Sequence, residues 1–258
     1  LLADTAYYRW GLHIDLNPDQ AVKTFMTTDE NTIYMLKNGE VTPFEIRGVN
    51  MGVGIPGEWA TDYAIDKETY LRWFQYIQDM GANTIRIYTI LQDDFYNAFY
   101  EYNQNRQDPL YLIHGVWVND YIQNSHLDAY DNKFRQALID DCRTVVDIVH
   151  GQKKLSLGYG LGSGSYRKDI SPWVIGYILG VEWEDVTVVY TNDKFPNRNS
   201  YQGRYLYTTP DASPFEALLA EVGDRIISYE SRRYKQQRLI AFSNWPTTDP
   251  FDYPQDIT

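Results

Sequence analysis

Strand-like and helix-like patterns of apolar residues alternate along the chain. The strand-like runs occupy residues 44–50, 84–88, 110–118, 173–183 and 239–242. Between most of them, apolar residues recur every three or four positions, which is typical of helices with one buried face. Repeated strand–helix units predict a parallel sheet with right-handed crossovers.

Residues that cap or end helices support these assignments. Asp66 can cap the first main helix, and Gly81 can end it. Gly151 can end the helix that carries Cys142 on its apolar stripe. Residues 213–216 (Ser-Pro-Phe-Glu) form a capping box with proline at the first helical position, so a further helix should start there.

Three stretches fall outside this pattern. Asn38-Gly39 separates two apolar runs, which predicts a hairpin that returns into residues 44–50. Residues 152–172 are predicted to be a loop. Gly160, Gly162 and Gly164 within it do not match a dinucleotide fingerprint, because no helix opens after them, so we expect that part to be flexible. Residues 185–212 are predicted to be a long polar excursion.

Together these elements predict an α/β fold of the (β/α)8 TIM-barrel class. A closed barrel needs eight strands, and five are found here, so the barrel looks truncated after strand five. Residues 1–43 would form an N-terminal extension and β-hairpin, and residues 44–258 the first five βα units. We expect a sheet that does not close with these residues alone, and a remainder of the same polypeptide beyond Thr258 as its partner.

Composition narrows the function. A net charge of −12 argues against nucleic acid as a partner, since phosphate binding needs a basic face. Cys142 is the single cysteine, so no intrachain disulfide is possible; with no HExxH pattern, neither a zinc site nor another cofactor is predicted. The 7 Trp, 23 Tyr and 10 Phe suit carbohydrate binding, although most of these rings should lie in the core.

In (β/α)8 enzymes the reacting residues lie at the carboxyl ends of the strands. That rule selects as candidate substrate-binding residues Asn50, Arg86, Tyr88, His114, Trp117, Asp120, Trp183, Glu184, Asn244 and Trp245. Strand alternation would place Glu182 and Glu184 on one face, with Gly176 and Gly180 leaving room beside them. A carboxyl group in a poorly solvated barrel mouth keeps its proton more easily, so Glu182 is the candidate catalytic acid.

Each candidate also has a structural interpretation. Glu182 could form a salt bridge with Arg86. His114 could be a hydrogen-bonded core histidine or a sugar contact. Trp183 and Trp245 could be core residues, and Glu58 could lie in a solvated loop.

Three segments taken in order resemble the large clan of retaining (β/α)8 glycoside hydrolases. They are RGVN at 47–50, GANTIRIYTI at 81–90 and WVIGYILGVEWED at 173–185, which resemble strands one, two and four. Residues 203–224 and 242–251 also look like a bacterial family of glycosidase-like barrels. The resemblance implies that Arg86 lies near the nucleophile and that Glu182 is the acid/base. It also implies that the nucleophile, a glutamate of strand seven, lies outside this chain.

Two functions follow from this resemblance. The first is a glycoside hydrolase or transglycosidase that acts on a poly- or oligosaccharide by a retaining two-carboxylate mechanism. The alternative is a non-catalytic glycan-binding barrel within a larger glycan-processing protein. Val181 stands where the clan has asparagine and favours the alternative, whereas Glu182 with Arg86 favours the enzyme. An extracytoplasmic or membrane-associated location is slightly favoured.

Overall fold

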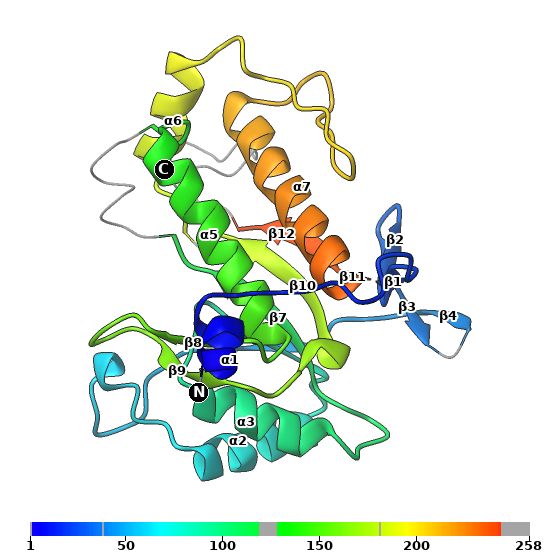
Figure 1. Ribbon diagram of the computed structural model, residues 1–258, viewed down its shortest axis with the longest axis vertical. Helices are drawn as coiled ribbons and strands as arrows, with labels where there is room; N and C mark the ends of the chain where they lie inside the picture. Colours follow the sequence, from blue (N-terminus) through cyan, green and yellow to red (C-terminus); the bar gives the residue numbers. More distant parts are fainter. Residues whose placement is uncertain (1, 38, 119–127, 181, 244–258) are drawn as a thin grey trace, which may run out of the picture. The chain divides into compact units, whose positions relative to one another are not determined.

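The computed structural model describes residues 2–37, 39–118, 128–180 and 182–243, and it has a mixed α/β architecture (Figure 1). Five strands form a parallel sheet in the order β12-β10-β7-β6-β5. Their bounds are β5 Gly48–Met51, β6 Thr84–Ile87, β7 Tyr111–Val116, β10 Val174–Leu179 and β12 Leu239–Phe242. The predicted parallel sheet of five strands is therefore confirmed, while its membership of a barrel stays a prediction.

Four of the main helices lie near the predicted residues. They are α2 Lys67–Asp79, α3 Asp93–Asn103, α5 Asn132–Val149 and α7 Pro214–Tyr234, whereas α6 Asp185–Lys194 was not predicted. The Asp66 carboxylate accepts the Thr69 N–H at 2.8 Å, which satisfies one free donor of the first turn. The predicted capping box is also present, because Ser213 N–H donates to Glu216 Oε2 at 2.6 Å and Glu216 N–H donates to Ser213 Oγ at 3.2 Å.

The predicted hairpin is also present, with one difference in where it leads. Strands β3 (Thr32–Lys37) and β4 (Glu40–Pro43) pair antiparallel, and β2 (Met26–Asp29) adds a third strand. The return strand ends at Pro43, and β5 starts separately in the parallel sheet. The other short elements are α1 Leu2–Asp4, η1 Thr5–Arg9, β1 Lys23–Thr24, η2 Ala60–Asp62, η3 Ser171–Trp173 and β11 Gln236–Gln237.

Two segments that were predicted to lack regular structure contain it. Residues 152–172 hold an antiparallel hairpin of β8 (Lys153–Ser156) and β9 (Ser163–Tyr166). The expected flexible glycine loop is therefore wrong: Gly164 lies in β9, and a Cβ on Gly162 would overlap the Ile90 carbonyl oxygen. The polar stretch after residue 184 contains helix α6, whose apolar residues do not form one stripe and so escaped the periodicity analysis.

The chain divides into two compact units. The first contains Leu1–Gly115, Thr144–Tyr177 and Glu230–Leu239, and the second contains Val116–Arg143, Ile178–Tyr229 and Ile240–Thr258. In the first unit, α2 and α3 pack through edge-to-face rings that include Phe74, Phe95 and Phe99. In the second, Trp183 packs against Phe134 and Phe215. These two aromatic clusters are the centres of their units.

A buried charged network lies in the first unit. Glu230 is 1% exposed, and its Oε1 accepts hydrogen bonds from Arg238 Nε at 2.7 Å and Tyr177 Oη at 3.1 Å. His150 Nε2 lies 2.8 Å from the same oxygen, and the His150 ring stacks on Tyr234. Arg238 also donates to the Ser171 carbonyl at 2.7 Å. The carboxylate therefore joins α7 to the amino-terminal part of β10 and to the segment that leads into β12.

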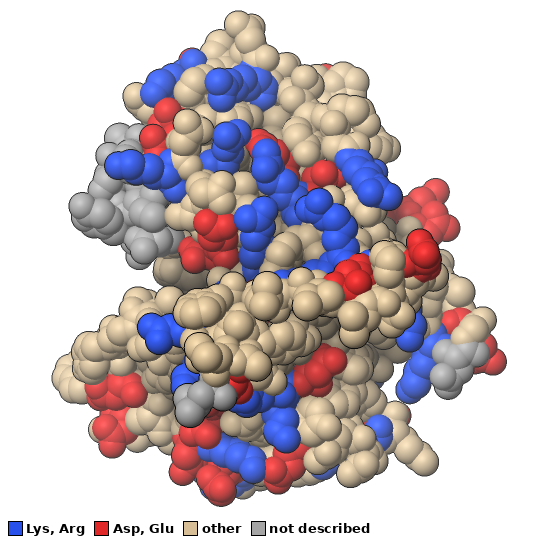
Figure 2. Space-filling model, viewed as in Figure 1, with Lys and Arg blue, Asp and Glu red and all other residues tan. Residues whose placement is uncertain are grey.

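Three further features concern the surface charge, the single cysteine and the apolar character of the helices. Figure 2 shows acidic and basic side chains interspersed on the face in view. Cys142 is a buried free thiol, as the apolar stripe of its helix predicted. Within the described ranges, no helix combines the length and apolar character that crossing a bilayer would require.

Candidate functional site

Asn50 and Arg86 lie side by side at the carboxyl ends of β5 and β6. The parallel register pairs them directly, and it pairs Arg86 in turn with Ile113 of β7. Register partners in a parallel sheet face the same side, so these side chains share one face. Ile85 and Ile87 alternate to the other face and are fully buried. The geometry thus brings together two of the predicted site residues within the first unit.

The Arg86 guanidinium has one clear contact and one unsatisfied donor. Its Cζ lies 4.7 Å from the centroid of the Tyr88 ring, a cation–π distance that also brings Tyr88 into the group. Its Nε is buried and has no hydrogen-bond partner in the part of the chain that the structure describes. An unpaired buried donor is costly, so an acceptor at this position would be stabilising.

His114 belongs to the helix-covered face and not to this site. The register pairs it with Ile87, and it is fully buried. Its Nε2 lies 2.8 Å from Tyr96 Oη, and its Nδ1 lies 2.8 Å from the Gly115 carbonyl oxygen. Burial lowers the pKa of His114 to about 4, so the ring is neutral at pH 7. This environment is that of a hydrogen-bonded core histidine, one of the two predicted alternatives, and the sugar contact stays a prediction.

The strand that leads to Glu182 is shorter than predicted. It ends at Leu179, and Gly180 follows with a φ of +76°. A Cβ at Gly180 would overlap the Trp183 indole, so the room left by this glycine is filled by a ring. Gly176 is also close to its neighbours, since a Cβ there would lie 3.0 Å from the Leu239 carbonyl oxygen. The prediction that alternation continues to Glu184, with open space beside the glutamates, is wrong.

A turn fixed by Trp183 carries Glu182 instead. Trp183 is 1% exposed, and its Nε1–H donates to the Leu179 carbonyl oxygen at 3.0 Å. Between these anchors, Glu182 has a φ of 55° and an exposed side chain. A left-handed backbone at a residue other than glycine costs roughly 1–3 kcal/mol and is often associated with function. Glu182 is thus held at the strand end facing solvent, not in the poorly solvated mouth that the sequence predicted.

The remaining candidates fall into three groups. Trp183 lies in the core of its unit, as its structural interpretation predicted, and its assignment to substrate binding stays a prediction. Glu184 is half-buried and directly precedes α6, and Trp117 follows β7 with 37% of its surface exposed. Asp120, Asn244 and Trp245 lie outside the described residues. Among the described residues, no group of three or more His, Cys, Asp or Glu side chains is arranged to hold a metal ion.

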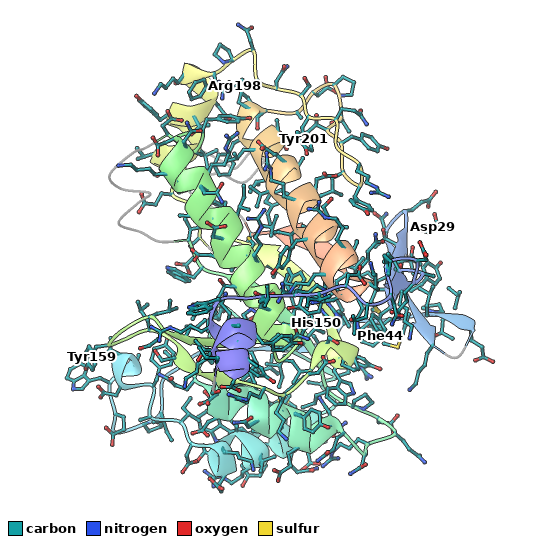
Figure 3. All side chains as sticks on the ribbon, viewed as in Figure 1. Asp29, Phe44, His150, Tyr159, Arg198 and Tyr201 are labelled. Carbon is teal, nitrogen blue, oxygen red and sulfur yellow. The ribbon has the colours of Figure 1, made fainter. Side chains whose placement is uncertain are left out.

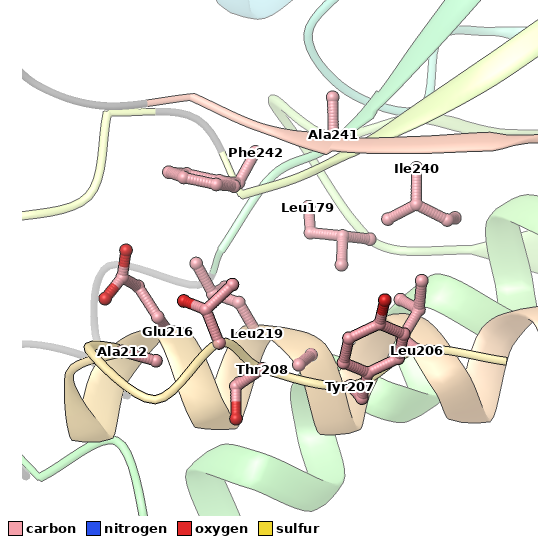
Figure 4. A pocket seen from close by; sticks show the side chains of 12 residues that line it. Leu179, Leu206, Tyr207, Thr208, Ala212, Glu216, Leu219, Ile240, Ala241 and Phe242 are labelled. Carbon is pink, nitrogen blue, oxygen red and sulfur yellow. The ribbon is translucent and has the colours of Figure 1, made fainter. Parts of the chain in front are cut away.

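The second unit contains a pocket of about 250 Å³ that the sequence did not predict (Figure 4). It lies between α7, β12 and the segment that precedes α7, and its lining is mostly apolar, with residues such as Leu206, Leu219 and Phe242. Its carboxylate, Glu216, is already engaged by the Ser213 backbone. The pocket is therefore mainly apolar, and it is a weaker candidate for chemistry than the strand ends.

Comparisons with known proteins give one distant similarity. No family model matches the sequence, and no curated protein matches it. A solved structure described as "Crystal structure of BpGH50" is similar with a TM-score of 0.44 and 12% sequence identity. The similarity covers 93% of this chain and 55% of that chain, so this chain spans about half the length of that protein. The candidate site rests on the residues and geometry described above.

Proposed function

We propose that this chain is part of a glycoside hydrolase or transglycosidase that acts on a poly- or oligosaccharide by a retaining two-carboxylate mechanism. The observation that carries the proposal is the buried Nε of Arg86, which has no hydrogen-bond partner among the described residues and lies next to Asn50 at the carboxyl ends of adjacent parallel strands. A fixed cation with a free donor at this edge suits a carboxylate nucleophile. The segments that resemble retaining glycoside hydrolases include both residues.

Glu182 is the proposed acid/base. It follows β10, and its exposed carboxyl group can be reached by a leaving glycosidic oxygen. In the first step it would donate its proton to that oxygen while the nucleophile attacks the anomeric carbon. In the second step it would take a proton from the water that hydrolyses the glycosyl-enzyme. The left-handed backbone and the Trp183 anchor support a fixed orientation for such a group.

The nucleophile is proposed to come from sequence beyond Thr258. Retaining chemistry needs the two carboxyl groups about 5–5.5 Å apart. A glutamate that reached the Arg86 edge would also accept the hydrogen bond that Nε offers. This part of the proposal makes the remainder of the polypeptide a required partner of the present chain.

A non-catalytic glycan-binding barrel is the second candidate. Val181 favours it, because the clan's asparagine at this place binds the sugar 2-hydroxyl and valine cannot. Such a protein would keep the carbohydrate affinity and lack turnover. The two candidates therefore differ in kinetics, not in ligand class.

The decisive experiment is Glu182→Gln in a protein that includes the sequence beyond Thr258. The amide cannot donate a proton as an acid does, so hydrolysis of substrates with poor leaving groups should fall by roughly 10²–10⁴-fold. Aryl glycosides with good leaving groups need little protonation, and their first step should fall much less. Glu40→Gln, which changes an exposed carboxyl group of β4 outside the candidate site, is the matched control and should change neither rate.

Three outcomes decide between the candidates. Equal losses on both substrate types would reassign Glu182 to sugar binding. Absence of turnover in the unmodified protein, with glycan binding retained, would favour the non-catalytic barrel. Turnover by the 258-residue chain alone would mean that the second carboxylate lies within it, with Glu184 and Glu58 the first residues to replace.

A further inference from the structure

Two large aromatic rings are exposed at one end of the first unit. Trp59 is 80% exposed in the segment that follows β5, and Tyr159 is 82% exposed at the tip of the β8–β9 hairpin. Figure 3 shows Tyr159 at the outer end of this hairpin, beside the short turn η2. Burying such rings is strongly favourable, so fully exposed Trp and Tyr side chains in neighbouring loops need an explanation.

Asp62 binds the Tyr159 hydroxyl and the backbone of Trp59. Tyr159 Oη donates to Asp62 Oδ1 at 2.8 Å, and the Trp59 backbone N–H donates to Asp62 Oδ2 at 3.2 Å. The turn is closed from the other side, since Asp62 N–H donates to the Trp59 carbonyl oxygen at 2.9 Å. One carboxylate thus joins two loops that are 97 residues apart in sequence. The Tyr159 ring and the backbone that carries Trp59 are therefore positioned before any ligand arrives, which reduces the entropy that binding must overcome.

The hairpin is also fixed to the carboxyl edge of the sheet. Ser163 N–H donates to Gln92 Oε1 at 3.0 Å, and Ser165 N–H donates to Asp93 Oδ2 at 2.9 Å. Gly162 packs so closely on the Ile90 carbonyl that no side chain fits there. All three of these contacts involve residues that follow β6, the strand of Arg86. The two rings therefore belong to the same end of the first unit as the Asn50–Arg86 pair.

We propose that Trp59 and Tyr159 form a platform that binds a neutral oligosaccharide chain leading to the proposed reaction site. The C–H face of a pyranose ring stacks on an aromatic ring, and its hydroxyl groups need acceptors beside that ring. Asp62 and the exposed Glu58 supply carboxylate oxygens there. Acidic groups around the rings disfavour anionic ligands, including nucleic acid. The ligand class rests on the proposed function, whereas the existence of the platform rests on the geometry.

The test measures binding without requiring turnover. The 258-residue chain is run in native gels that contain barley β-glucan, galactomannan or agarose, and its retardation is compared with that in plain gels. Trp59→Ala and Tyr159→Ala should each weaken binding roughly three- to tenfold, the loss that corresponds to one aromatic contact. Tyr159→Phe keeps the ring but loses the bond to Asp62, so its effect should be smaller.

Trp10→Ala is the matched control, because Trp10 is also exposed (69%) and lies in the N-terminal segment. It should leave retardation unchanged, and circular dichroism should show that all variants fold. Failure of all three polysaccharides to retard the unmodified chain would overturn the proposal. Retardation of both alanine variants to the same extent as the unmodified chain would overturn it as well. A change in elution volume on gel filtration without a change in retardation would instead identify a protein contact. The 258-residue chain is expected to bind without hydrolysis, because the proposed nucleophile lies beyond Thr258, so this test of the platform does not depend on the catalytic proposal.

Discussion

Replacing Glu230 by glutamine should destabilise the first unit strongly. The substitution keeps the shape of the side chain and removes its charge. Arg238, whose side chain is 0% exposed, would then keep a buried positive charge without its counterion. The amide can also present its NH2 group where Oε1 now accepts hydrogen bonds from Tyr177 and Arg238. Both effects act in the folded state alone.

The expected loss in the free energy of unfolding is roughly 3–5 kcal/mol, the range for removing one partner of a buried ion pair. That is a large part of the 5–15 kcal/mol that is typical of whole domains. Glu101→Gln is the matched control. It removes the same charge from a 2.6 Å pair with Lys67, but the two side chains are 49% and 34% exposed. An exposed pair contributes about 0–1 kcal/mol, so this control should be nearly neutral.

Urea unfolding at pH 7, followed by circular dichroism, compares the two variants. A loss below about 1 kcal/mol for Glu230→Gln would show that the burial and geometry of the network do not govern its energy. A double variant with Arg238→Met gives a second criterion. Because the methionine removes the uncompensated charge, the double variant should lose less than the sum of the two single losses.

The contribution of this network to the free energy of unfolding should decrease as the pH falls. Burial alone would raise the pKa of Glu230, but the Arg238 charge and the bond with His150 outweigh it and hold the pKa below its usual value. A depressed carboxyl pKa adds stability above the unfolded value near 4.5, and this stability is lost as the pH falls through the folded pKa. Glu230→Gln should therefore flatten the loss of stability below pH 4.5.

Two further predictions concern the other buried groups. The pKa of His114 is about 4 in the folded protein and 6.5 when the ring is exposed. As the pH falls, the unfolded chain therefore takes up the proton before the folded protein does. The free energy of unfolding should consequently fall by about 2 kcal/mol between pH 7 and pH 5. His114→Gln should reduce this slope in urea titrations, and an unchanged slope would contradict the assignment. Gly180→Ala should lower the free energy of unfolding by roughly 1–2 kcal/mol, because alanine disfavours the left-handed backbone at this position. Overlap of the new methyl group with the Trp183 indole should add to this loss. Gly57→Ala, with a φ of +94° and open space around it, should show the backbone loss alone in thermal unfolding.

The sequence predicted the elements whose signals are local. Asp66 and the 213–216 capping box mark helix starts through bonds made within one turn, and the Asn38-Gly39 pair marks a hairpin in the same way. The β8–β9 hairpin escaped because its glycines serve contacts with Ile90 and Asp93, which are distant in sequence. The periodicity of apolar residues and the presence of turn residues could not by themselves distinguish that packing from a flexible loop.

The candidate site was predictable only in part, for a related reason. Asn50 and Arg86 followed from the rule about strand ends, and the register brings them together. His114 met the same rule. Its side chain lies on the helix-covered face because its register partner is Ile87, and the sequence alone does not give that register. Glu182 was placed by extending alternation past Leu179, where Gly180 and the Trp183 indole turn the chain. Exposed rings such as Trp59 carry no pattern that separates them from core rings.

The interleaving of the two units along the chain affects how the protein can be synthesised and shortened. The first unit is complete only when Glu230–Leu239 joins segments that end at Gly115 and Tyr177. During translation at roughly 5–20 residues per second, the interval between Gly115 and Arg238 lasts on the order of ten seconds. From their own synthesis until Glu230 is made, His150 and Tyr177 lack the carboxylate that they share in the folded unit. A nascent chain therefore exposes a partly built first unit to chaperones and proteases, and no single cut in the sequence separates one unit from the other.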